Sequence, residues 1–229
     1  MDAFVGTSGW YYEWNKKKNL DWFVENSGLN SVELNASFYR FPFPGNIKNW
    51  GGEKGKGLRW SVKVHRSITH WRQFSESALE IWENFRGLFK PMDHLIDFYL
   101  FQAPPRFEEI ERALKFAEKT GLGERFALEI RNRELLGNDE LCGRFLNRVT
   151  LVSVDSPDYI NRIFPGKTVY MRMHGRENWY SYNYPRGGEI KETIRKITEL
   201  EREKVYIYFN NNHKMLENAR KALKAFSDL

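Results

Sequence analysis

Apolar and polar residues alternate in eight short stretches that recur along the whole chain. These stretches are rich in Val, Ile, Tyr and Phe, the residues that favour β-strands. The expected strands are residues 3–8, 31–35, 59–65, 97–102, 126–131, 150–155, 168–174 and 204–210. Each stretch is too short for a typical helix, and the alternation of apolar and polar residues matches the two-residue period of a strand.

Between most of these stretches, apolar residues recur at helical spacing. This spacing predicts helices over residues 77–90, 106–119, 189–202 and 213–226. The connections over 41–57 and 156–167 have no long helix. Strands separated by helices form parallel βαβ units. Eight such units predict the α/β fold class, as a single (β/α)8 TIM-type barrel that spans residues 1–229 as one domain.

The polar residues of the expected strands fall on one face. In the stretch SVELN, Val32 and Leu34 share one face, and Glu33 and Asn35 share the other. The same alternation places further polar pairs together: Lys63 and His65, Glu129 and Arg131, Ser153 and Asp155, Arg172 and His174, Tyr208 and Asn210. In a barrel the apolar face meets the helices, and the other face points inward. Buried charges need partners, so we expect these groups to meet one another, water or a ligand near the C-terminal strand ends, where barrel enzymes have their active sites. A solvent-facing antiparallel sheet also alternates, but the intervening helices argue against it.

Composition narrows the possible partners. The chain has 16% aromatic residues, a net charge of +6 and a pI near 9.3. A basic, aromatic-rich surface fits nucleic acid, although the charge could also serve only solubility. No apolar run approaches the about 18 residues of a membrane span, and the N-terminus does not resemble a signal peptide. Cys142 is the single cysteine, so we expect no internal disulfide and a cytoplasmic protein.

Several motifs resemble those of one family. They are GTSGW (6–10), SVELNASFYRFP (31–42), KVHRSITH (63–70), QAPPRF (102–107), ALEIR (127–131), VDSP (154–157), YMRMHGR (170–176) and VYIYFNNN (205–212). In this order, over nearly the whole chain, they resemble the domain-of-unknown-function 72 family, also called YecE-like. The resemblance implies a TIM-type barrel. It also implies an activity, because archaeal members are associated with cleavage of DNA at oxidised pyrimidines such as 5-hydroxyuracil.

The candidate catalytic residues are Lys63, Glu129, Asp155, Glu33 and His65. A desolvated lysine near other cations loses its proton readily and becomes a nucleophile that can attack the sugar C1′ of a nucleotide. Two carboxylates can divide the work, one protonated and one ionised. The alternatives are structural: Lys63 pairs with Glu33 or Glu129, Glu129 with Arg131, or Asp155 with Arg172. Asp155 could also cap a turn, since Ser156 and Pro157 follow it.

Candidate substrate-binding residues lie at the expected strand ends and in the loops that follow. They are Trp10, Asn35, Tyr39, His70, Gln102, Arg131, Arg172, His174, Trp179, Tyr180 and Asn210. Amides suit the edge of a pyrimidine, rings can stack on a flipped base, and arginines, including Arg176 in the Gly175-Arg176 turn, can hold phosphate. The alternatives are rings that plug the barrel, an arginine in a salt bridge, and Asn210 in a helix N-cap cluster.

Three histidines raise the question of a metal. His65, His70 and His174 could bind zinc or manganese together with the carboxylates. Their spacing forms no metal-binding motif, so we expect neither a metal nor a cofactor.

These observations favour a DNA-repair enzyme for oxidised pyrimidine lesions. It would be a DNA glycosylase with lyase activity, or a lesion-specific endonuclease, and thus a DNA-binding hydrolase or lyase that acts on damaged single- or double-stranded DNA. Two alternatives remain, because fold alone does not fix chemistry. One is a sugar or sugar-phosphate isomerase or hydrolase, and the other is a noncatalytic binder of nucleic acid or a metabolite.

Overall fold

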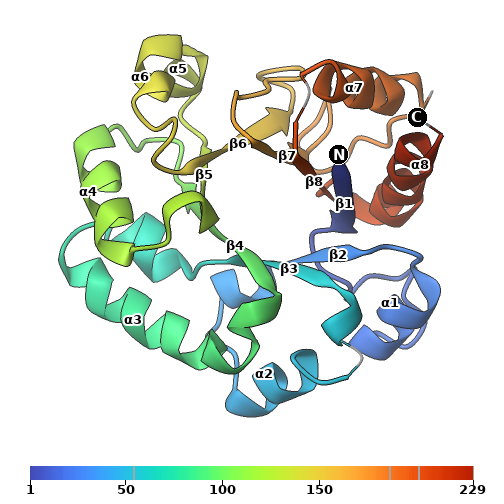
Figure 1. Cartoon of the computed structure of the whole chain (residues 1–229), viewed down its shortest axis with the longest axis horizontal. Helices are drawn as coiled ribbons and strands as arrows, with labels where there is room; N and C mark the ends of the chain where they lie inside the picture. Colours follow the sequence, from blue (N-terminus) through green and yellow to red (C-terminus); the bar gives the residue numbers. More distant parts are fainter. Residues whose placement is uncertain (54, 186, 201, 229) are drawn as a thin grey trace. The chain divides into compact units, whose positions relative to one another are not determined.

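The computed structural model describes residues 1–53, 55–185, 187–200 and 202–228, along which strands and helices alternate (Figure 1). Within these residues the strands are β1 (Asp2–Thr7), β2 (Ser31–Leu34), β3 (Arg59–Lys63), β4 (Ile96–Ala103), β5 (Phe126–Ile130), β6 (Thr150–Asp155), β7 (Thr168–Met173) and β8 (Lys204–Phe209). The α-helices are α1 (Leu20–Asn26), α2 (Pro44–Trp50), α3 (Ser77–Phe89), α4 (Ile110–Thr120), α5 (Arg133–Gly137), α6 (Asp139–Gly143), α7 (Gly188–Thr198) and α8 (Met215–Ser227). The short helices are the 3₁₀ helices η1 (Ala36–Phe38), η2 (Gly55–Gly57), η4 (Lys90–Leu95), η5 (Gly123–Arg125) and η6 (Asn212–Lys214), and the π-helix η3 (Ser67–Trp71).

The order of the strands is that of a (β/α)8 barrel. It runs β1-β8-β7-β6-β5-β4-β3-β2, and every strand pair whose register is described is parallel. Each of the expected strands is present with its ends shifted by no more than two residues. The predicted α/β fold class is therefore confirmed.

The expected connections are also present. Over residues 41–57 the only α-helix among the described residues is the seven-residue α2, and residues 156–167 contain no helix. The helix expected to begin at residue 106 begins instead at Ile110, because the Phe107 N–H bonds the Pro104 carbonyl in a preceding turn. The sequence therefore predicted the elements better than their ends, as is usual when helix ends depend on local turns.

The chain forms two compact units. The terminal unit comprises Met1–Glu33, Glu53–Arg59 and Val152–Leu229, and the central unit comprises Leu34–Gly52 and Trp60–Leu151. Three boundaries fall inside β2, β3 and β6, and the fourth falls in the connection between α2 and η2. The expected single domain over residues 1–229 stays a prediction.

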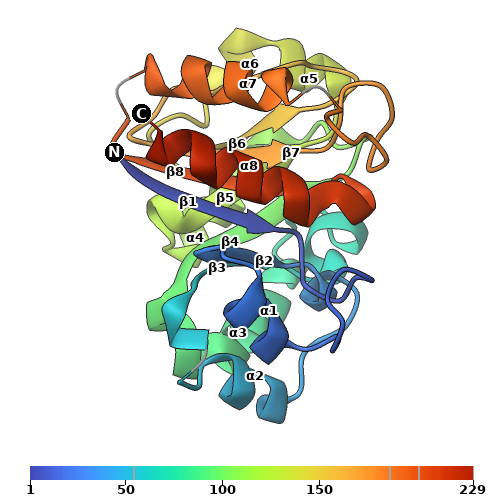
Figure 2. The same cartoon turned by 90° about the vertical axis from the view of Figure 1, so that its right-hand side faces the viewer.

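In the terminal unit, two amphipathic helices cover paired strands. β8 lies between β1 and β7, and β7 also pairs with β6. Figures 1 and 2 show α8 along β1 and β8, and α7 packs beside α8. α8 buries Met215, Leu216, Ala219 and Ala222, which recur every three or four residues. This spacing forms the apolar stripe by which a helix packs on a sheet.

In the central unit, the core is unusually aromatic. β4 pairs with β3 on one side and with β5 on the other, and α3 contacts α4 (Figure 1). Phe101 of β4 stacks on Phe126 of β5 with ring centroids 3.8 Å apart, and Trp82 of α3 lies 5.2 Å from Phe101. These rings bury the large apolar surface that holds the helices on the strands.

Candidate functional site

The strand register groups several predicted site residues of the central unit. Residues at the same level of neighbouring parallel strands point to the same side, as do residues two apart within a strand. Lys63 is level with Leu100, and Gln102 is level with Glu129. Since Leu100 and Gln102 are two residues apart, Lys63, Gln102 and Glu129 share one face, as the alternation predicted.

In the terminal unit, the register separates two residues that the sequence placed together. Arg172 is level with Val154 and Tyr208, whereas Asp155 is level with Met173. The expectation that Asp155 points the same way as Arg172 is therefore wrong. The physical reason is that both faces of β6 are buried, so the alternation of Val and polar residues does not tell which face points inward.

Glu33 is a buried carboxylate with three hydrogen-bond donors. It accepts from Ser8 Oγ at 2.7 Å, from the Tyr170 hydroxyl at 2.6 Å and from Arg172 Nη2 at 2.7 Å. Burial and the negative charge of Glu33 raise the pKa of Tyr170 well above its usual value, so this hydroxyl stays protonated and donates. Glu33 and Arg172 are both fully buried, and their pairing replaces the considered pairing of Arg172 with Asp155.

Asp155 binds the long connection between β7 and α7. Its carboxylate accepts from Arg176 Nε at 3.1 and 3.0 Å, from the Tyr184 hydroxyl at 2.8 Å and from the Asn161 N–H at 3.0 Å. The contact with Asn161 is the turn cap that the sequence suggested. Arg176 also pairs with Glu192 at 3.1 Å, so two carboxylates bind the arginine that was a candidate for holding phosphate.

Four predicted binding residues meet in the terminal unit. The ring of His174 lies 5.1 Å from Trp179 and 5.5 Å from Tyr180, and Asn210 Nδ2 lies 3.4 Å from His174 Nδ1. His174 and Asn210 directly follow β7 and β8, whereas the two rings come from the connection between β7 and α7. The neighbouring Asn211 is the N-cap residue of η6, but its side chain donates to the Tyr182 carbonyl and does not cap that helix.

Trp10 belongs to an aromatic loop that packs on α1. Its carbonyl accepts from Asn15 Nδ2 at 2.9 Å. Nearby, Tyr12 stacks on Trp14 at 5.7 Å between ring centroids, and Trp14 contacts Phe23 of α1. Part of this loop therefore covers the core, as the alternative proposed, and the binding role of Trp10 stays a prediction.

In the central unit, an unusual turn follows β3. The single-turn π-helix η3 is closed by the Arg72 N–H, which bonds the Ser67 carbonyl at 2.9 Å. Gln73 and Phe74 then adopt left-handed φ angles of 44° and 60°. Such conformations are costly for residues other than glycine, and π-turns of this kind often occur at functional sites. This turn carries His70.

Lys63 lies at the end of β3, and not in the middle of a strand as the expected range of 59–65 implied. Its side chain is only 8% exposed, and its Nζ lies 4.1 Å from the centroid of the Phe38 ring. Ser37 connects η1 to the end of β3, because its hydroxyl donates a hydrogen bond to the Lys63 carbonyl at 2.6 Å. The ring of His70 meets the same Phe38 ring edge-on at 5.0 Å between centroids, so the Phe38 ring contacts both Lys63 and His70.

The surroundings of His70 are strongly positive. Burial, followed by the charges of Lys63, Arg131 and Arg66, lowers the pKa of His70 from 6.5 to about 4. His70 is therefore neutral at physiological pH, and Thr69 Oγ1 lies 2.8 Å from its Nδ1. Burial also lowers the pKa of His65, which contacts Ser67 Oγ at 2.7 Å through Nδ1. A neutral histidine with the cations Lys63 and Arg66 nearby, and with Arg131 paired to Glu129, favours an anionic ligand.

The remaining predicted residues of the central unit come from β5, with the residue that follows it, and from the segment after β2. Glu129 and Arg131 form the ion pair that was considered, at 2.9 Å, and the Glu129 side chain is fully buried while that of Arg131 is 8% exposed. Tyr39 packs edge-on against Phe38 at 5.0 Å and is largely exposed. The buried Oδ1 of Asn35 accepts no hydrogen bond from the described residues, so it is an acceptor that a ligand can use.

Phe38 and Arg66 were not predicted as site residues. Both lie inside the motifs that carry the family resemblance, SVELNASFYRFP and KVHRSITH. Their position next to Tyr39 and His65 was the only signal that could have identified them. The predicted residues thus divide between the two units. Convergence of Glu33 and Arg172 with Lys63 and Glu129 in one cavity stays a prediction.

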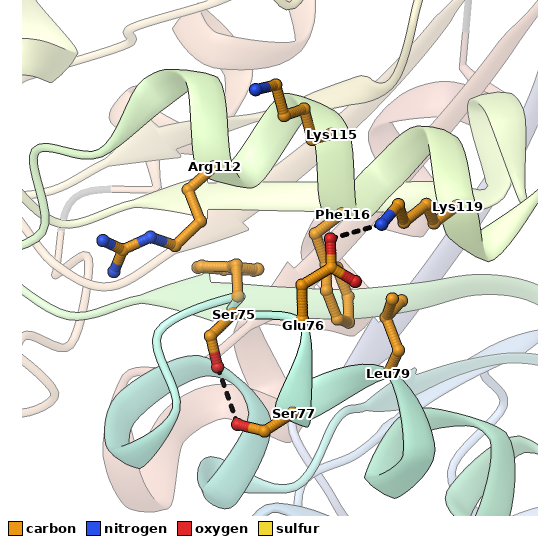
Figure 3. Close-up of a pocket in the computed structure, with 9 residues that line it drawn as sticks. Ser75, Glu76, Ser77, Leu79, Arg112, Lys115, Phe116 and Lys119 are labelled. Carbon is orange, nitrogen blue, oxygen red and sulfur yellow. Dashed lines mark hydrogen bonds and ion pairs between the residues drawn. The ribbon is translucent and has the colours of Figure 1, made fainter.

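A separate groove lies between α3 and α4 (Figure 3). It has a volume of about 560 Å³, and Figure 3 shows Arg112, Lys115 and Lys119 of α4 opposite the start of α3. Lys119 pairs with Glu76, and Ser75 bonds Ser77 at 3.0 Å. None of the predicted site residues lines this groove.

Within the described part of the chain, no group of three or more His, Cys, Asp or Glu side chains is arranged to hold a metal ion. No described helix is long and apolar enough to cross a membrane.

Comparisons with known proteins agree with the fold. The model of the family described as "Protein of unknown function DUF72" matches residues 4–228. No curated protein matches the chain significantly. Among solved structures, a DUF72 family protein from Thermotoga maritima is 23% identical with a TM-score of 0.80, covering 99% of this chain and all of the other.

Two further structures are similar. A DUF72 family protein from Enterococcus faecalis is 21% identical with a TM-score of 0.77, covering 98% of this chain and 95% of the other. A fusion protein described as xylose isomerase-like TIM barrel/4-hydroxyphenylpyruvate dioxygenase is 12% identical with a TM-score of 0.55, covering 98% of this chain and 42% of the other. At these identities the likeness shows the fold.

Proposed function

Since the chain belongs to the DUF72 family of TIM-barrel proteins, we propose that it is a DNA-repair enzyme that excises an oxidised pyrimidine and uses Lys63 as its nucleophile. The single observation that carries this proposal is the group formed by Lys63, Phe38 and neutral His70 in the field of Arg66 and Arg131. The oxidised pyrimidine comes from the family resemblance. The group itself supports an anionic substrate with a ring to contact.

The chemistry begins at the buried amine. The lone pair of Lys63 Nζ attacks C1′ of the damaged nucleotide, and the C1′–N bond breaks with its electrons on the departing base. The proton that the amine loses passes to water, because His70 with a pKa of about 4 is too weak a base to hold it at neutral pH. This proton then passes to the base. Opening of the sugar ring, in which O4′ takes a proton from water, gives an iminium ion between Nζ and C1′. Loss of a C2′ proton to water then breaks the C3′–O bond and expels the 3′-phosphate.

The cations and carboxylates have different tasks in this proposal. Arg66 holds the negatively charged backbone next to Lys63, whereas Arg131 pairs with the carboxylate of Glu129. Glu33 and Asp155 each accept hydrogen bonds from at least three groups of the chain. Carboxylates bound in this way are suited to hold β2, β6 and β7 with their connections in place.

Borohydride trapping tests the nucleophile. The protein is incubated with labelled oligonucleotides that carry a single 5-hydroxyuracil, and borohydride reduces any iminium ion to a stable adduct. We expect an adduct with the native chain and none with Lys63→Ala or Lys63→Arg, since arginine keeps the charge but does not form the iminium ion. Lys115→Ala, an exposed lysine of the same unit, is the matched control and should keep the adduct.

Two results would overturn the proposal. One is the absence of cleavage and of any adduct with oxidised, abasic or undamaged DNA, with or without divalent metal. The other is an adduct that persists in Lys63→Arg. Circular dichroism and thermal melting of each variant establish that it is folded.

A second candidate is a sugar-phosphate isomerase or hydrolase. The specific observation in its favour is that a neutral histidine with Lys63 and Arg66 nearby fits a single phosphate group. This enzyme would bind inorganic phosphate competitively with its substrate and would have no measurable affinity for an oligonucleotide.

A further inference from the structure

Two aromatic side chains of the central unit lie largely in solvent. Tyr39, which follows η1, is 65% exposed, and Trp71, the last residue of η3, is 64% exposed. A ring of this size loses much favourable free energy when it stays in water. Exposed large aromatic side chains are enriched at surfaces that bind a partner.

Arg66 joins these two rings. Its guanidinium carbon lies 5.0 Å from the centroid of the Trp71 ring and 5.8 Å from that of Tyr39. None of the described carboxylates pairs with Arg66, and its buried Nε has no hydrogen-bond partner among the described residues. The three side chains, Tyr39, Arg66 and Trp71, are called the stacking triad below. The triad offers two ring faces and a positive charge that is not neutralised by an acid.

The triad is continuous with the group around Lys63. Tyr39 meets Phe38 edge-on at 5.0 Å, and Phe38 is the ring that Lys63 Nζ contacts at 4.1 Å. On the other side, Trp71 lies 6.0 Å from the ring of His65, which precedes Arg66 in the chain. A strand bound on the triad would therefore lead directly to the proposed nucleophile.

We propose that the stacking triad binds unpaired bases of a DNA strand, with Arg66 on a backbone phosphate. This inference rests on the proposed function and specifies its substrate as single-stranded or locally opened DNA. Bases stack on aromatic rings through their faces, and these faces are covered in an intact duplex. A ring–arginine–ring arrangement binds any base sequence, because every base has a π-face and every nucleotide a phosphate.

The test uses undamaged single strands, so that it does not depend on catalysis. Binding of a fluorescein-labelled oligothymidine to the full chain is measured by anisotropy, beside a duplex of the same length. We expect Trp71→Ala and Tyr39→Ala each to weaken single-strand binding by about 5- to 150-fold. Trp71→Phe keeps a ring and should retain most of the affinity. Duplex binding should change much less.

Matched controls separate stacking from general attraction. Tyr11→Ala removes another exposed ring, and Lys115→Gln removes a charge from the groove between α3 and α4 (Figure 3). Neither should change single-strand affinity by more than about twofold, as expected for groups outside the binding surface. Sedimentation of native and Trp71→Ala protein checks that the oligomeric state is the same.

Several results would overturn the inference. They are equal losses in Trp71→Phe and Trp71→Ala, a loss of the same size in Tyr11→Ala or Lys115→Gln, a preference for duplex, or a dimer that dissociates on Trp71→Ala. An oligonucleotide that does not bind the native chain overturns it as well. Failure of the proposed function is distinct: the native chain would then bind undamaged single strands normally but form no borohydride adduct with damaged ones.

Discussion

At the scale of single residues, His70 links the proposed chemistry to stability. Its pKa is about 4 in the folded chain, whereas a histidine in the unfolded chain titrates near 6.5. Between these values the unfolded chain binds one more proton than the folded chain at this position. The free energy of unfolding therefore decreases as the pH falls from about 6.5 to about 4. Above this window His70 is neutral in both states and does not make the stability depend on pH.

We predict that His70→Asn removes part of this pH dependence. Asparagine keeps a polar group beside Thr69 but takes up no proton in this range. Urea unfolding at about pH 7 and about pH 5 should show a smaller difference between the two midpoints in the variant than in the native chain. The exposed His213 provides the control: His213→Asn should leave the native difference unchanged. An unchanged difference in His70→Asn would show that burial and the neighbouring cations do not lower the pKa of His70.

At the scale of elements, the connection from β3 to α3 places His70 and Trp71. Phe74 adopts a left-handed φ of 60°, which is unfavourable for a bulky residue, yet its ring is buried against Phe107 at 5.0 Å and Phe116 at 5.6 Å. Burial of this ring is the interaction that offsets the strained backbone. This strained turn sets the direction in which the chain leaves η3 toward α3.

We predict that Phe74→Ala destabilises the chain by about 3–5 kcal/mol, the usual loss for a buried phenylalanine. Guanidinium unfolding measures the change. Phe43→Ala, which removes a largely exposed ring, should cost less than about 0.5 kcal/mol, as surface substitutions usually do. A small loss in Phe74→Ala would mean that release of the left-handed conformation compensates for the lost packing, and that the ring does not anchor the turn.

The same connection marks the limit of what the sequence predicts. Strands such as β6 follow from runs of Val, Thr and Leu between turns, because burial in a sheet requires that pattern. Helix α4 follows from its apolar spacing. The π-turn of η3 has no such signal, since it depends on backbone hydrogen bonds such as that of the Arg72 N–H to the Ser67 carbonyl, which most residue types could form.

The candidate site shows a second limit. The period of two correctly places Lys63, Gln102 and Glu129 on one face, because a strand must alternate. It does not reveal which face of β6 carries Asp155, since apolar and polar residues are buried on both sides of a parallel strand. Ion-pair partners such as Arg172 with Glu33 depend on residues far apart in the chain, and local patterns carry no information about them.

At the scale of the whole molecule, the net charge of +6 is too small and too widely spread to identify a ligand by itself. The salt dependence of the DNA-binding constant is more informative about a nucleic-acid ligand, because each phosphate contact releases counterions from the nucleic acid. For a single strand the logarithm of the binding constant falls by about 0.7 per contact for each tenfold increase in salt. If the chain attracted DNA only through diffuse charge, replacing any one arginine would not specifically change the slope of this salt dependence.

We predict that Arg66→Gln lowers the steepness of this salt dependence by about 0.7, the share of one phosphate contact, measured by anisotropy over a salt titration. Trp71→Ala removes stacking and not charge, so it should weaken binding at every salt concentration and leave the slope unchanged. Lys115→Gln removes the same charge from a surface that lies outside the proposed path of the strand, and should also leave it unchanged. If Arg66→Gln and Lys115→Gln reduced the slope equally, DNA would be held by the overall positive charge, and the stacking triad would have no special place in binding.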